Sequence, residues 1–453
     1  MSTSKSQTLV DKYLKFQETC VSPFHTVQTV KNSLIQQGFT ELSLDSKWNL
    51  DIGEKYFIRH RDKKTILAFY LGEQNLETTG FKIIAAHTDS PTLKMKLNPW
   101  KQNKDLSLIC PQTHGSLIYR TWLDQPLKVA GMVYKIKKHQ GKVLFDSLSS
   151  LPKLDSQLVA SDHAVGIIPE LAIHLDRNKN TSGPINPETQ MDILCSTSHS
   201  QENFIKSFWS SLGQNDDVDG FDLTFSPHFK HQVVGLDQSL IIGPRHDDLA
   251  MSFVGLEALL KASKNNKNKN TFVLGLLDAE ETGSQTASGA GSAFFRDCLL
   301  NISLNHPRSL KEKSPPDPVN IFSNSYLISA DMAHAFHPSH QSKHDTNHRP
   351  MLNQGLVVKE NTNDRYATTG ETHSMFKALC QEASVPLQNY VNRQDMGCGS
   401  TIGPILASQL GCNTVDVGLA MLGMHSSMET MGCKDLDYAA KVFEVFYRGS
   451  RLN

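Results

Sequence analysis

The chain has 453 residues, 39% of them hydrophobic and 20% charged, which is ordinary for a globular protein long enough to bury more than one core. Its net charge of −1 and isoelectric point near 7.0 give no electrostatic reason to expect nucleic acid or an anionic membrane as a partner. No stretch approaches the roughly 18 apolar residues of a membrane span.

The N-terminal part of the chain predicts helices followed by a buried strand. Val27, Val30 and Leu34 recur at helical spacing, and Gly38 follows as a stop signal, so we expect helix within the first 40 residues. Residues 81–86 form a compact, mostly apolar stretch that is typical of a buried strand.

A β-rich module is predicted between Leu93 and about Ser239. Apolar residues alternate from Leu93 to Leu97, and residues 132–134 and 143–145 flank a polar turn at Gly141, which is the pattern of a hairpin. Helical character is weak in this part of the chain. We therefore expect it to be inserted into a domain of a different class.

Helices and strands alternate again from Arg245 onward. Leu249, Phe253, Leu256 and Leu260 share one face of a predicted helix that begins just after Asp247 and Asp248. Further apolar runs predict strands over 272–277, 326–330 and 414–419 and a closing helix around 442–446.

Histidines and acids follow several of the predicted strands. His87, the pair Glu280 and Glu281, and Asp331 each come directly after an apolar run. Ligands of α/β sheets gather beyond the carboxyl ends of the strands, so we expect these side chains to lie near one another. Adjacent carboxylates at the end of a buried strand need a counter-charge, and a divalent metal ion is the usual one. The pattern indicates a binuclear zinc-type hydrolase.

Two zinc ions about 3.5–4 Å apart need a carboxylate that bridges them and histidine or carboxylate ligands on either side. Asp247 is the natural bridge, because the start of a helix fixes it. His87 and Asp331 would complete one metal site, and Glu281 and His425 the other.

The remaining acids have supporting roles in this hypothesis. Asp89 lies two residues from His87 and is expected to accept its second imidazole N–H. A glutamate that lies beside the metals without binding them takes the proton of the bridging water and later gives it to the leaving amine. We expect this of Glu280, although spacing alone does not decide between Glu280 and Glu281.

Ordinary structural roles are the alternative for each residue. A single histidine among 19 is more often a surface or core residue than a ligand, and Asp248 alternatively caps the following helix. The histidine-rich stretch from His334 to His348 fits a loop as well as a metal site. The combination of all five candidate ligands in strand-end contexts favours the metal hypothesis.

At this point the sequence resembles the aspartyl aminopeptidase family of zinc metallopeptidases (peptidase family M18). The resemblance covers nearly the whole chain. Its motifs are SPFH from Ser22, AAHTDSPTLKMK from Ala85, TWLDQPLKVAG from Thr121, LAIHLDR from Leu171, GPRHDDLA from Gly243, DAEETGSQTASGAGS from Asp278, SADMAHAFHPSH from Ser329, KHDTNHRP from Lys343, RYATTGET from Arg365, GSTIGPILA from Gly399 and GMHSSMET from Gly423.

The resemblance implies an enzyme that removes N-terminal Asp or Glu from peptides with two Zn²⁺ ions per subunit, Mn²⁺ or Co²⁺ being alternatives in one site. It implies an α/β catalytic domain with a mixed central sheet over 1–92 and 240–453, interrupted by a β-rich dimerisation domain over 93–239. It also implies a homo-oligomer, a tetrahedral dodecamer built from dimers, with peptides as its substrates.

The resemblance also assigns roles residue by residue. His87, Asp247 and Asp331 match ligands of one zinc, with Asp247 as the bridge, and Glu281 and His425 match the ligands of the other. Glu280 matches the general base. The residues that match the family's substrate-binding positions are His174, Glu280, Asp331, His334, Lys359 and Tyr366. Of these, Lys359 and Tyr366 match the positions that hold the acidic side chain of the substrate.

His174 matches a histidine that crosses the dimer interface toward the reaction intermediate; without the family match, it would be a histidine on an amphipathic helix.

Four positions depart from the family pattern. Asp248 stands where many members carry Asn, His246 where Leu is common, Ala279 where His or Asn is frequent, and Gln125 where Arg is frequent.

Two other functions remain open on the sequence. A metal-dependent amidase or deacylase of N-acyl amino acids would use the same ligands with a different pocket. A catalytically silent assembly protein is the less favoured alternative, because all five ligands and Glu280 are present. The eight cysteines are widely spread without a C-x-x-C pair, and the N-terminus lacks a signal-peptide core, so we expect a cytoplasmic protein.

Overall fold

The computed structural model describes residues 8–147, 149–181, 183–197, 200–215, 218–265, 267–311 and 314–449. The first seven residues, which contribute to the expectation that no signal peptide is present, lie outside this part of the chain. The chain forms two compact units. Unit 1 contains residues 1–89, 231–424 and 429–453, and unit 2 contains residues 90–230 and 425–428.

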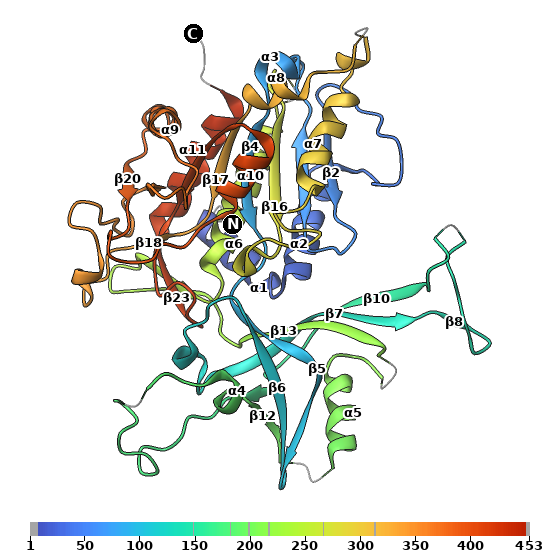
Figure 1. The fold of residues 1–453 in the computed structure, drawn as a ribbon, viewed down its shortest axis with the longest axis vertical. Helices are drawn as coiled ribbons and strands as arrows, with labels where there is room; N and C mark the ends of the chain where they lie inside the picture. Colours follow the sequence, from blue (N-terminus) through green and yellow to red (C-terminus); the bar gives the residue numbers. More distant parts are fainter. Residues whose placement is uncertain are drawn as a thin grey trace, which may run out of the picture. The chain divides into compact units, whose positions relative to one another are not determined.

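A mixed sheet is the centre of unit 1 (Figure 1). In spatial order its strands are β1 (Thr40–Glu41), β2 (Lys55–Arg59), β3 (Ile66–Tyr70), β16 (Phe272–Leu277), β4 (Lys82–His87), β17 (Tyr326–Ala330), β21 (Asn413–Gly418), β19 (Leu356–Lys359) and β20 (Leu387–Tyr390). Strand β4 lies between β16 and β17 and is parallel to both, so these three strands end at the same edge of the sheet.

Helices cover both faces of this sheet, and alternate strand residues face each layer. Ile84 and Ala86 pack into one core and Ile83 and Ala85 into the other, as the two-residue period of a strand requires. Helices of the first layer are α1 (Leu9–Thr19), α2 (Pro23–Gln36), α6 (His246–Ala262), α9 (Gly370–Glu382) and α11 (Cys433–Arg448). Those of the second are α7 (Phe294–Leu304), α8 (Pro318–Ser323) and α10 (Ile402–Leu410), and the short α3 (Leu76–Thr79) precedes β4.

A smaller sheet of unit 1 carries two segments that approach the edge of the central sheet. Its strands, in order, are β14 (Gln232–Val234), β15 (Leu240–Gly243), β23 (Glu429–Gly432), β22 (Ala420–Leu422) and β18 (Ala333–His334). Strand β15 leads directly into α6, and β18 follows β17 after two residues.

Unit 2 is built from antiparallel strands around its own core. In order they are β10 (Leu154–Ala160), β7 (Pro126–Ile136), β11 (Gly166–Ile167), β12 (Ile193–Ser196), β6 (Leu106–His114), β5 (Thr92–Asn103) and β13 (Gly220–Pro227). Because β13 pairs with β7 as well as with β5, the sheet closes on itself. Two helices, α4 (Pro187–Gln190) and α5 (Gln201–Ser211), and the hairpin of β8 (Lys138–His139) and β9 (Lys142–Val143) complete the unit.

The fold class predicted from the sequence is confirmed: the chain is α/β with a mixed central sheet and a β-rich part. The predicted hairpin is wrong in one of its strands. Residues 132–134 pair with β10 and β13, and the turn at Gly141 closes the separate β8–β9 hairpin. The alternation from Leu93 ends after Met95, where a bulge shifts the register of β5 against β6, and Leu97 is 90% exposed.

Two helical expectations also need correction. The β-rich part contains the helix α5, whose Phe204, Phe208 and Trp209 pack into the core of unit 2. Helix α6 is buried on nearly every side rather than on one face, because it packs between the central sheet and α11. No helix of the described residues has the length and apolarity that crossing a bilayer requires.

Candidate metal centre

The candidate site of unit 1 lies where three parallel strands end. His87 is the last residue of β4, the 3₁₀ turn Glu280–Thr282 begins three residues after β16, and Asp331 directly follows β17. Since β4 lies between β16 and β17, the sequence expectation that these side chains meet is satisfied by the sheet topology itself.

Two residues in the left-handed conformation direct the acids into this site. Arg245 has φ 62° and lies two residues after β15, ahead of Asp247, while Ala279 has φ 63° and lies two residues after β16, ahead of Glu280. Residues with a Cβ adopt this conformation at a cost of roughly 1–2 kcal/mol, so the surrounding packing must impose it. The first residues of α6, Asp247 and Asp248, are themselves non-helical.

Ligand atoms of the predicted residues converge. One group contains His87, Asp247, Asp248 and Asp331, and a second contains His87, Glu280 and Glu281; within each group the ligand atoms lie within 4.8 Å of one another. The Nε2 atom of His87 is 3.4 Å from Asp247 Oδ1 and 3.9 Å from Glu280 Oε2. His87, Asp247, Asp248 and Asp331 are all buried.

Asp89 joins the ends of β4 and β16. Its Oδ1 accepts the backbone N–H of Glu280 at 3.0 Å and its Oδ2 that of Glu281 at 3.3 Å. His87 Nδ1 lies 3.0 Å from the Asp89 carbonyl oxygen and 3.3 Å from its Oδ1. The backbone carbonyl is therefore a nearer partner of the imidazole than the carboxylate that the sequence led us to expect.

The tautomer of His87 follows from these contacts. A carbonyl oxygen only accepts, so Nδ1 is the donor and carries the hydrogen in the neutral ring. The lone pair of Nε2 then faces carboxylate oxygens of Asp247 and Glu280. Lone pairs that face each other in a buried site require a proton or a cation between them, so the donor set fits a metal ion.

Burial and mutual repulsion shift the acids of the site in one direction. Burial, opposed in part by Lys359, raises the pKa of Asp331 to about 6, and burial raises the pKa of Glu280 to about 8. Burial and the neighbouring carboxylates also raise the pKa of Glu281 and of Asp248 well above the usual range.

For His87, burial disfavours the charged ring, but the surrounding carboxylates raise its pKa well above 6.5. The site is thus rich in negative charge that a dication would offset. Nitrogen and oxygen donors in this ratio suit zinc or manganese.

Three backbone contacts fix the candidate ligands. Ser252 Oγ donates to the carbonyl of His87 at 2.7 Å, and the backbone N–H of His87 donates to Asp248 Oδ2 at 3.1 Å. The backbone N–H of Asp247 donates to Glu429 Oε2 at 3.1 Å. Asp248 therefore does not cap α6 through its side chain, and that alternative interpretation is wrong.

The other two predicted histidines belong to unit 2. His425 Nδ1 donates to the carbonyl of Ser116 at 2.9 Å, which leaves Nε2 as the nitrogen with the lone pair. The chain leaves unit 1 at Met424 and returns at Glu429. His174 is exposed in a stretch of turns over 171–177, so it does not lie on a helix.

Of the predicted substrate residues, Lys359 and His334 end strands of unit 1, whereas Tyr366 lies in the segment between β19 and α9. Lys359 ends β19 and is 2% exposed; its Nζ donates to the carbonyls of Asp331 at 2.9 Å and Met332 at 3.1 Å. The same ammonium lies 3.7 Å from Asp331 Oδ1 and 5.2 Å from the centre of the buried Tyr366 ring. His334 is exposed in β18, and its ring contacts that of Tyr390.

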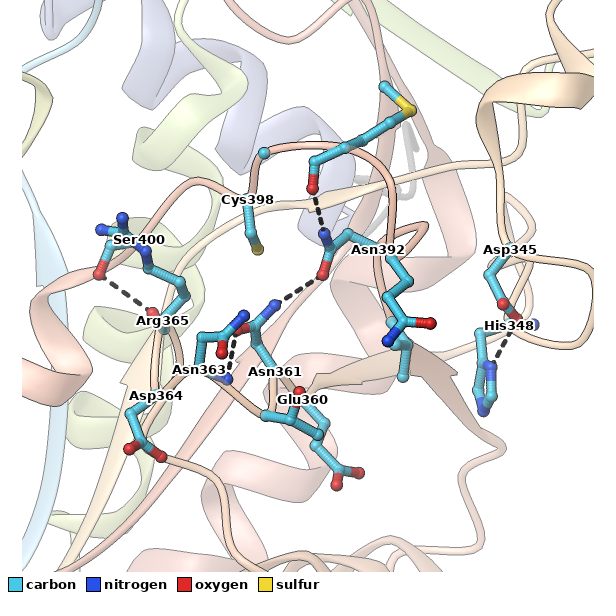
Figure 2. A pocket seen from close by; sticks show the side chains of 15 residues that line it. Asp345, His348, Glu360, Asn361, Asn363, Asp364, Arg365, Asn392, Cys398 and Ser400 are labelled. Carbon is cyan, nitrogen blue, oxygen red and sulfur yellow. Dashed lines mark hydrogen bonds and ion pairs between the residues drawn. The ribbon is translucent and has the colours of Figure 1, made fainter.

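Two adjoining pockets extend from these residues. One has a volume of 270 Å³ and is lined by His334, Tyr390 and Met424 among others. The other, of 880 Å³, is lined by the segment 360–365 between Lys359 and Tyr366 and by residues 391–400 (Figure 2). Figure 2 shows Asn361 and Asn392 facing each other, with Asn361 Nδ2 donating to Asn392 Oδ1 at 2.7 Å. Asn392, Met396 and Gly397 line both pockets.

After His334 in β18, the histidine-rich stretch is a loop that contains one 3₁₀ turn, Gln341–Lys343. The backbone N–H of His337 donates to His344 Nε2 at 3.0 Å, and His348 Nδ1 lies 2.7 Å from Asp345 Oδ1. Among the described residues, none of the groups able to hold a metal includes a histidine of this stretch.

Sequence reasoning placed the extra carboxylate of Asp248 near the metals without naming it a ligand, and it gave Glu429 no role. The adjacency of Asp247 and Asp248 was a signal for the first, but only the backbone shows that both carboxylates turn toward His87. Glu429 gave no signal, since it is 182 positions from the residue it binds.

Comparison with known proteins supports one family for the whole chain. The model of the aminopeptidase I zinc metalloprotease family (M18) matches residues 16–447. A probable M18 family aminopeptidase 2 of Stutzerimonas stutzeri is 37% identical over 459 residues and covers 100% of both chains. A protein of the same name from Ectopseudomonas mendocina is 35% identical, covering 98% of this chain and 99% of its own.

Solved structures of similar proteins support the same family. The cryo-EM structure of an Ape4 and Nbr1 complex contains a chain that is 32% identical with a TM-score of 0.89, covering 97% of this chain and 85% of its own. The S. cerevisiae mApe1 dodecamer has a TM-score of 0.83 at 25% identity, covering 97% of this chain and 96% of its own. The chain therefore belongs to the aminopeptidase I zinc metalloprotease family (M18) and is a metallo-aminopeptidase.

Proposed function

We propose that this aminopeptidase uses two zinc ions to remove acidic residues, Asp or Glu, from the N-termini of peptides. The observation that carries the proposal is the convergence of His87, Asp247 and Asp331 at one edge of the sheet, beside the buried ammonium of Lys359. The first part of the arrangement supplies metal ligands, and the second supplies a cation for an acidic side chain.

In this proposal His87 and Asp331 would hold one ion, Glu281 and His425 would hold the other, and Asp247 would be a ligand of both. When bound, the ions polarise the scissile carbonyl and lower the pKa of a water toward roughly 7. Asp89 supports His87 by accepting from its Nδ1–H, which directs Nε2 into the cluster.

Glu280 is proposed as the group that moves the proton. It takes a proton from the attacking water and delivers it to the leaving amine. Burial raises its pKa to about 8, so this carboxylate binds a proton more strongly than an exposed glutamate does, as suits a group that takes a proton from water. Asp89 fixes the backbone of Glu280 and therefore the direction of its carboxylate. His174 of a partner subunit is proposed to stabilise the charge that develops on the carbonyl oxygen.

Lys359 and Tyr366 are proposed to select the acidic side chain. Two backbone carbonyls fix the Lys359 ammonium in the interior, where a carboxylate would form a charge-assisted hydrogen bond with it. A neutral side chain would not form that bond, and the ammonium would keep its contacts with Asp331 and Met332. His334 lines the smaller pocket and is proposed to contact the substrate, and the larger pocket gives room for the following residues of the peptide.

The enzyme is proposed to act as a homo-oligomer, a dodecamer built from dimers, in the cytoplasm. The mApe1 structure is described as a dodecamer. Unit 2 is proposed to form the dimer contact. In support of this contact, unit 2 exposes three apolar side chains around His174: Leu171 by 47%, Ile173 by 44% and Leu175 by 75%. In support of the cytoplasmic location, the cysteines are free thiols. The mass of the purified particle tests the assembly.

A substrate panel tests the specificity. Asp-, Glu-, Leu- and Lys-aminoacyl reporters are compared with and without a chelator, on the wild type and on Lys359→Met. We expect the acidic reporters to be turned over fastest, chelation to abolish turnover, and Lys359→Met to lose activity mainly on acidic reporters. Lys82→Met is the matched control, because Lys82 is a half-buried lysine at the opposite end of β4. Equal turnover of Leu and Asp reporters by the wild type would defeat the proposed specificity.

A further inference from the structure

Asp248 lies among the proposed ligands of the first metal. It is fully buried, and its ligand atom lies within 4.8 Å of those of His87, Asp247 and Asp331. Its two oxygens have different surroundings. Oδ2 accepts the backbone N–H of His87 at 3.1 Å, whereas Oδ1 has no hydrogen-bond partner among the residues that the structure describes.

A buried carboxylate oxygen without a partner is costly, so something must compensate it. No lysine or arginine forms an ion pair with Asp248 within the described ranges, and the other groups of its cluster are two further carboxylates and one imidazole. Two solutions are chemically available. Either the carboxyl keeps a proton and donates it to a neighbouring carboxylate, or Oδ1 binds the same cation as its neighbours.

Geometry favours the cation. The contact of Oδ2 with His87 anchors the carboxylate, and a ligand oxygen of Asp248 lies within 4.8 Å of the ligand oxygens of Asp247 and Asp331, so the unpartnered Oδ1 belongs to a carboxylate that already adjoins the other ligands. We infer that Asp248 is a further ligand of the first metal, so that this site has one imidazole and three carboxylate groups. The inference rests on the proposed function, because it presumes the metal centre described above.

This donor set has a consequence for the choice of metal. Zinc in catalytic sites is satisfied by three protein ligands and one open position, and both nitrogen and oxygen donors bind it. Manganese prefers a larger number of hard oxygen donors. A third carboxylate therefore shifts the first site toward Mn²⁺ relative to Zn²⁺, which an asparagine at this position would not do.

Asparagine is an informative replacement. A carboxylate offers one oxygen to His87 and the other to the cation, whereas an amide has a single oxygen and an NH₂ group in place of the second. In Asp248→Asn the amide oxygen retains the contact with the His87 N–H, and the ligand is lost. The variant thus separates the proposed ligation from the role of Asp248 in holding the end of β4.

The test is metal binding by the apo protein, measured as a competition titration against a chromophoric chelator with Mn²⁺ and, separately, Zn²⁺. We expect Asp248→Asn to weaken Mn²⁺ binding at one of two sites by about tenfold or more, with a smaller change for Zn²⁺. Asp435→Asn is the matched control: Asp435 is also a fully buried carboxylate that accepts backbone N–H groups, those of Asn353 and Gly355, outside the metal groups.

A second measurement does not depend on a variant. In a crystal of the wild type grown with Mn²⁺, anomalous scattering at the manganese edge locates the ion, and Oδ1 of Asp248 is expected at bonding distance from it. An ion bound by His87 and Asp331 with Oδ1 out of bonding distance would overturn the inference, as would unchanged Mn²⁺ and Zn²⁺ affinities in Asp248→Asn. A wild type that binds neither metal would instead overturn the proposed function.

Discussion

Replacing Asp89 by asparagine tests the contact that joins the end of β4, which carries His87, to the segment after β16, which carries Glu280 and Glu281. Its carboxylate accepts the backbone N–H groups of Glu280 and Glu281 at 3.0 and 3.3 Å. An amide has only one acceptor oxygen, so in Asp89→Asn one of these N–H groups faces an NH₂ group. An unsatisfied buried N–H costs about 1–3 kcal/mol, and we expect the apo protein to lose that much stability to unfolding.

The functional loss should be larger than the stability loss suggests. The two N–H groups belong to the proposed base and to a proposed ligand, and a displacement of about 1 Å at a reacting group reduces turnover about 100-fold. Removal of a group that orients a ligand typically lowers metal affinity 10–100-fold. We therefore expect kcat/KM on an Asp reporter to fall about 100-fold, and metal affinity to fall in the same variant.

Asp435→Asn again provides the control, because Asp435 accepts two backbone N–H groups at 2.7 and 3.0 Å away from the cluster. The assays are denaturant unfolding of both apo variants, chelator competition and steady-state kinetics. Both variants should lose similar stability, and only Asp89→Asn should lose metal affinity and turnover. Wild-type metal affinity in a folded Asp89→Asn variant would refute the reasoning.

Three further predictions concern the proton, the metal and acid stability. Glu280→Gln should lower kcat by about 10²–10⁴-fold, while metal affinity stays within a few-fold of that of the wild type. Steady-state kinetics and chelator competition measure the two quantities. A variant with the kcat of the wild type would show that Glu280 is not the base. Metal affinity of the apo protein should rise between pH 6 and pH 8, because Asp331 and Glu280, with pKa values raised to about 6 and about 8, release protons when a cation binds. Titration heats in buffers of different ionisation enthalpy measure that release of protons. A metal affinity that does not change with pH would contradict the prediction. Burial lowers the pKa of His231 to about 3 in the folded protein, so the unfolded chain binds more protons as pH falls through 6.5, and stability should drop by about 2 kcal/mol from pH 7.5 to 5 on this account. Comparing that drop in denaturant unfolding of the wild type and of His231→Phe checks the last prediction, which fails if the two proteins show the same pH dependence.

The sequence predicted the parts of the site that depend on local pattern. His87 and Asp331 each follow an apolar run, and a parallel arrangement of those runs is sufficient to bring their ends to one edge. The predicted helix after Asp247 and the strand before Glu280 were confirmed for the same reason. These features need only the period of the strand or helix and the rule that parallel strands share their ends.

The remaining features depend on contacts between distant parts of the chain. The left-handed backbone at Arg245 and Ala279 is imposed by packing, and neither position is a glycine, which is the residue that would have predicted this conformation from the sequence. Glu429 reaches Asp247 across 182 positions. In unit 2, a bulge in β5 ended the alternation on which the hairpin prediction relied, and β7 paired with strands far along the chain. Local periodicity carries no information about such pairings.

The central claim is that the cluster around Asp247 holds two metal ions. Anomalous diffraction at the zinc edge, from crystals of the wild-type protein grown with Zn²⁺, tests it most directly. The account predicts two zinc peaks per chain, one bound by His87 and Asp331, the other by Glu281 and His425, with Asp247 bonded to both. A single peak, or zinc bound only at the histidines between His334 and His348, would contradict it.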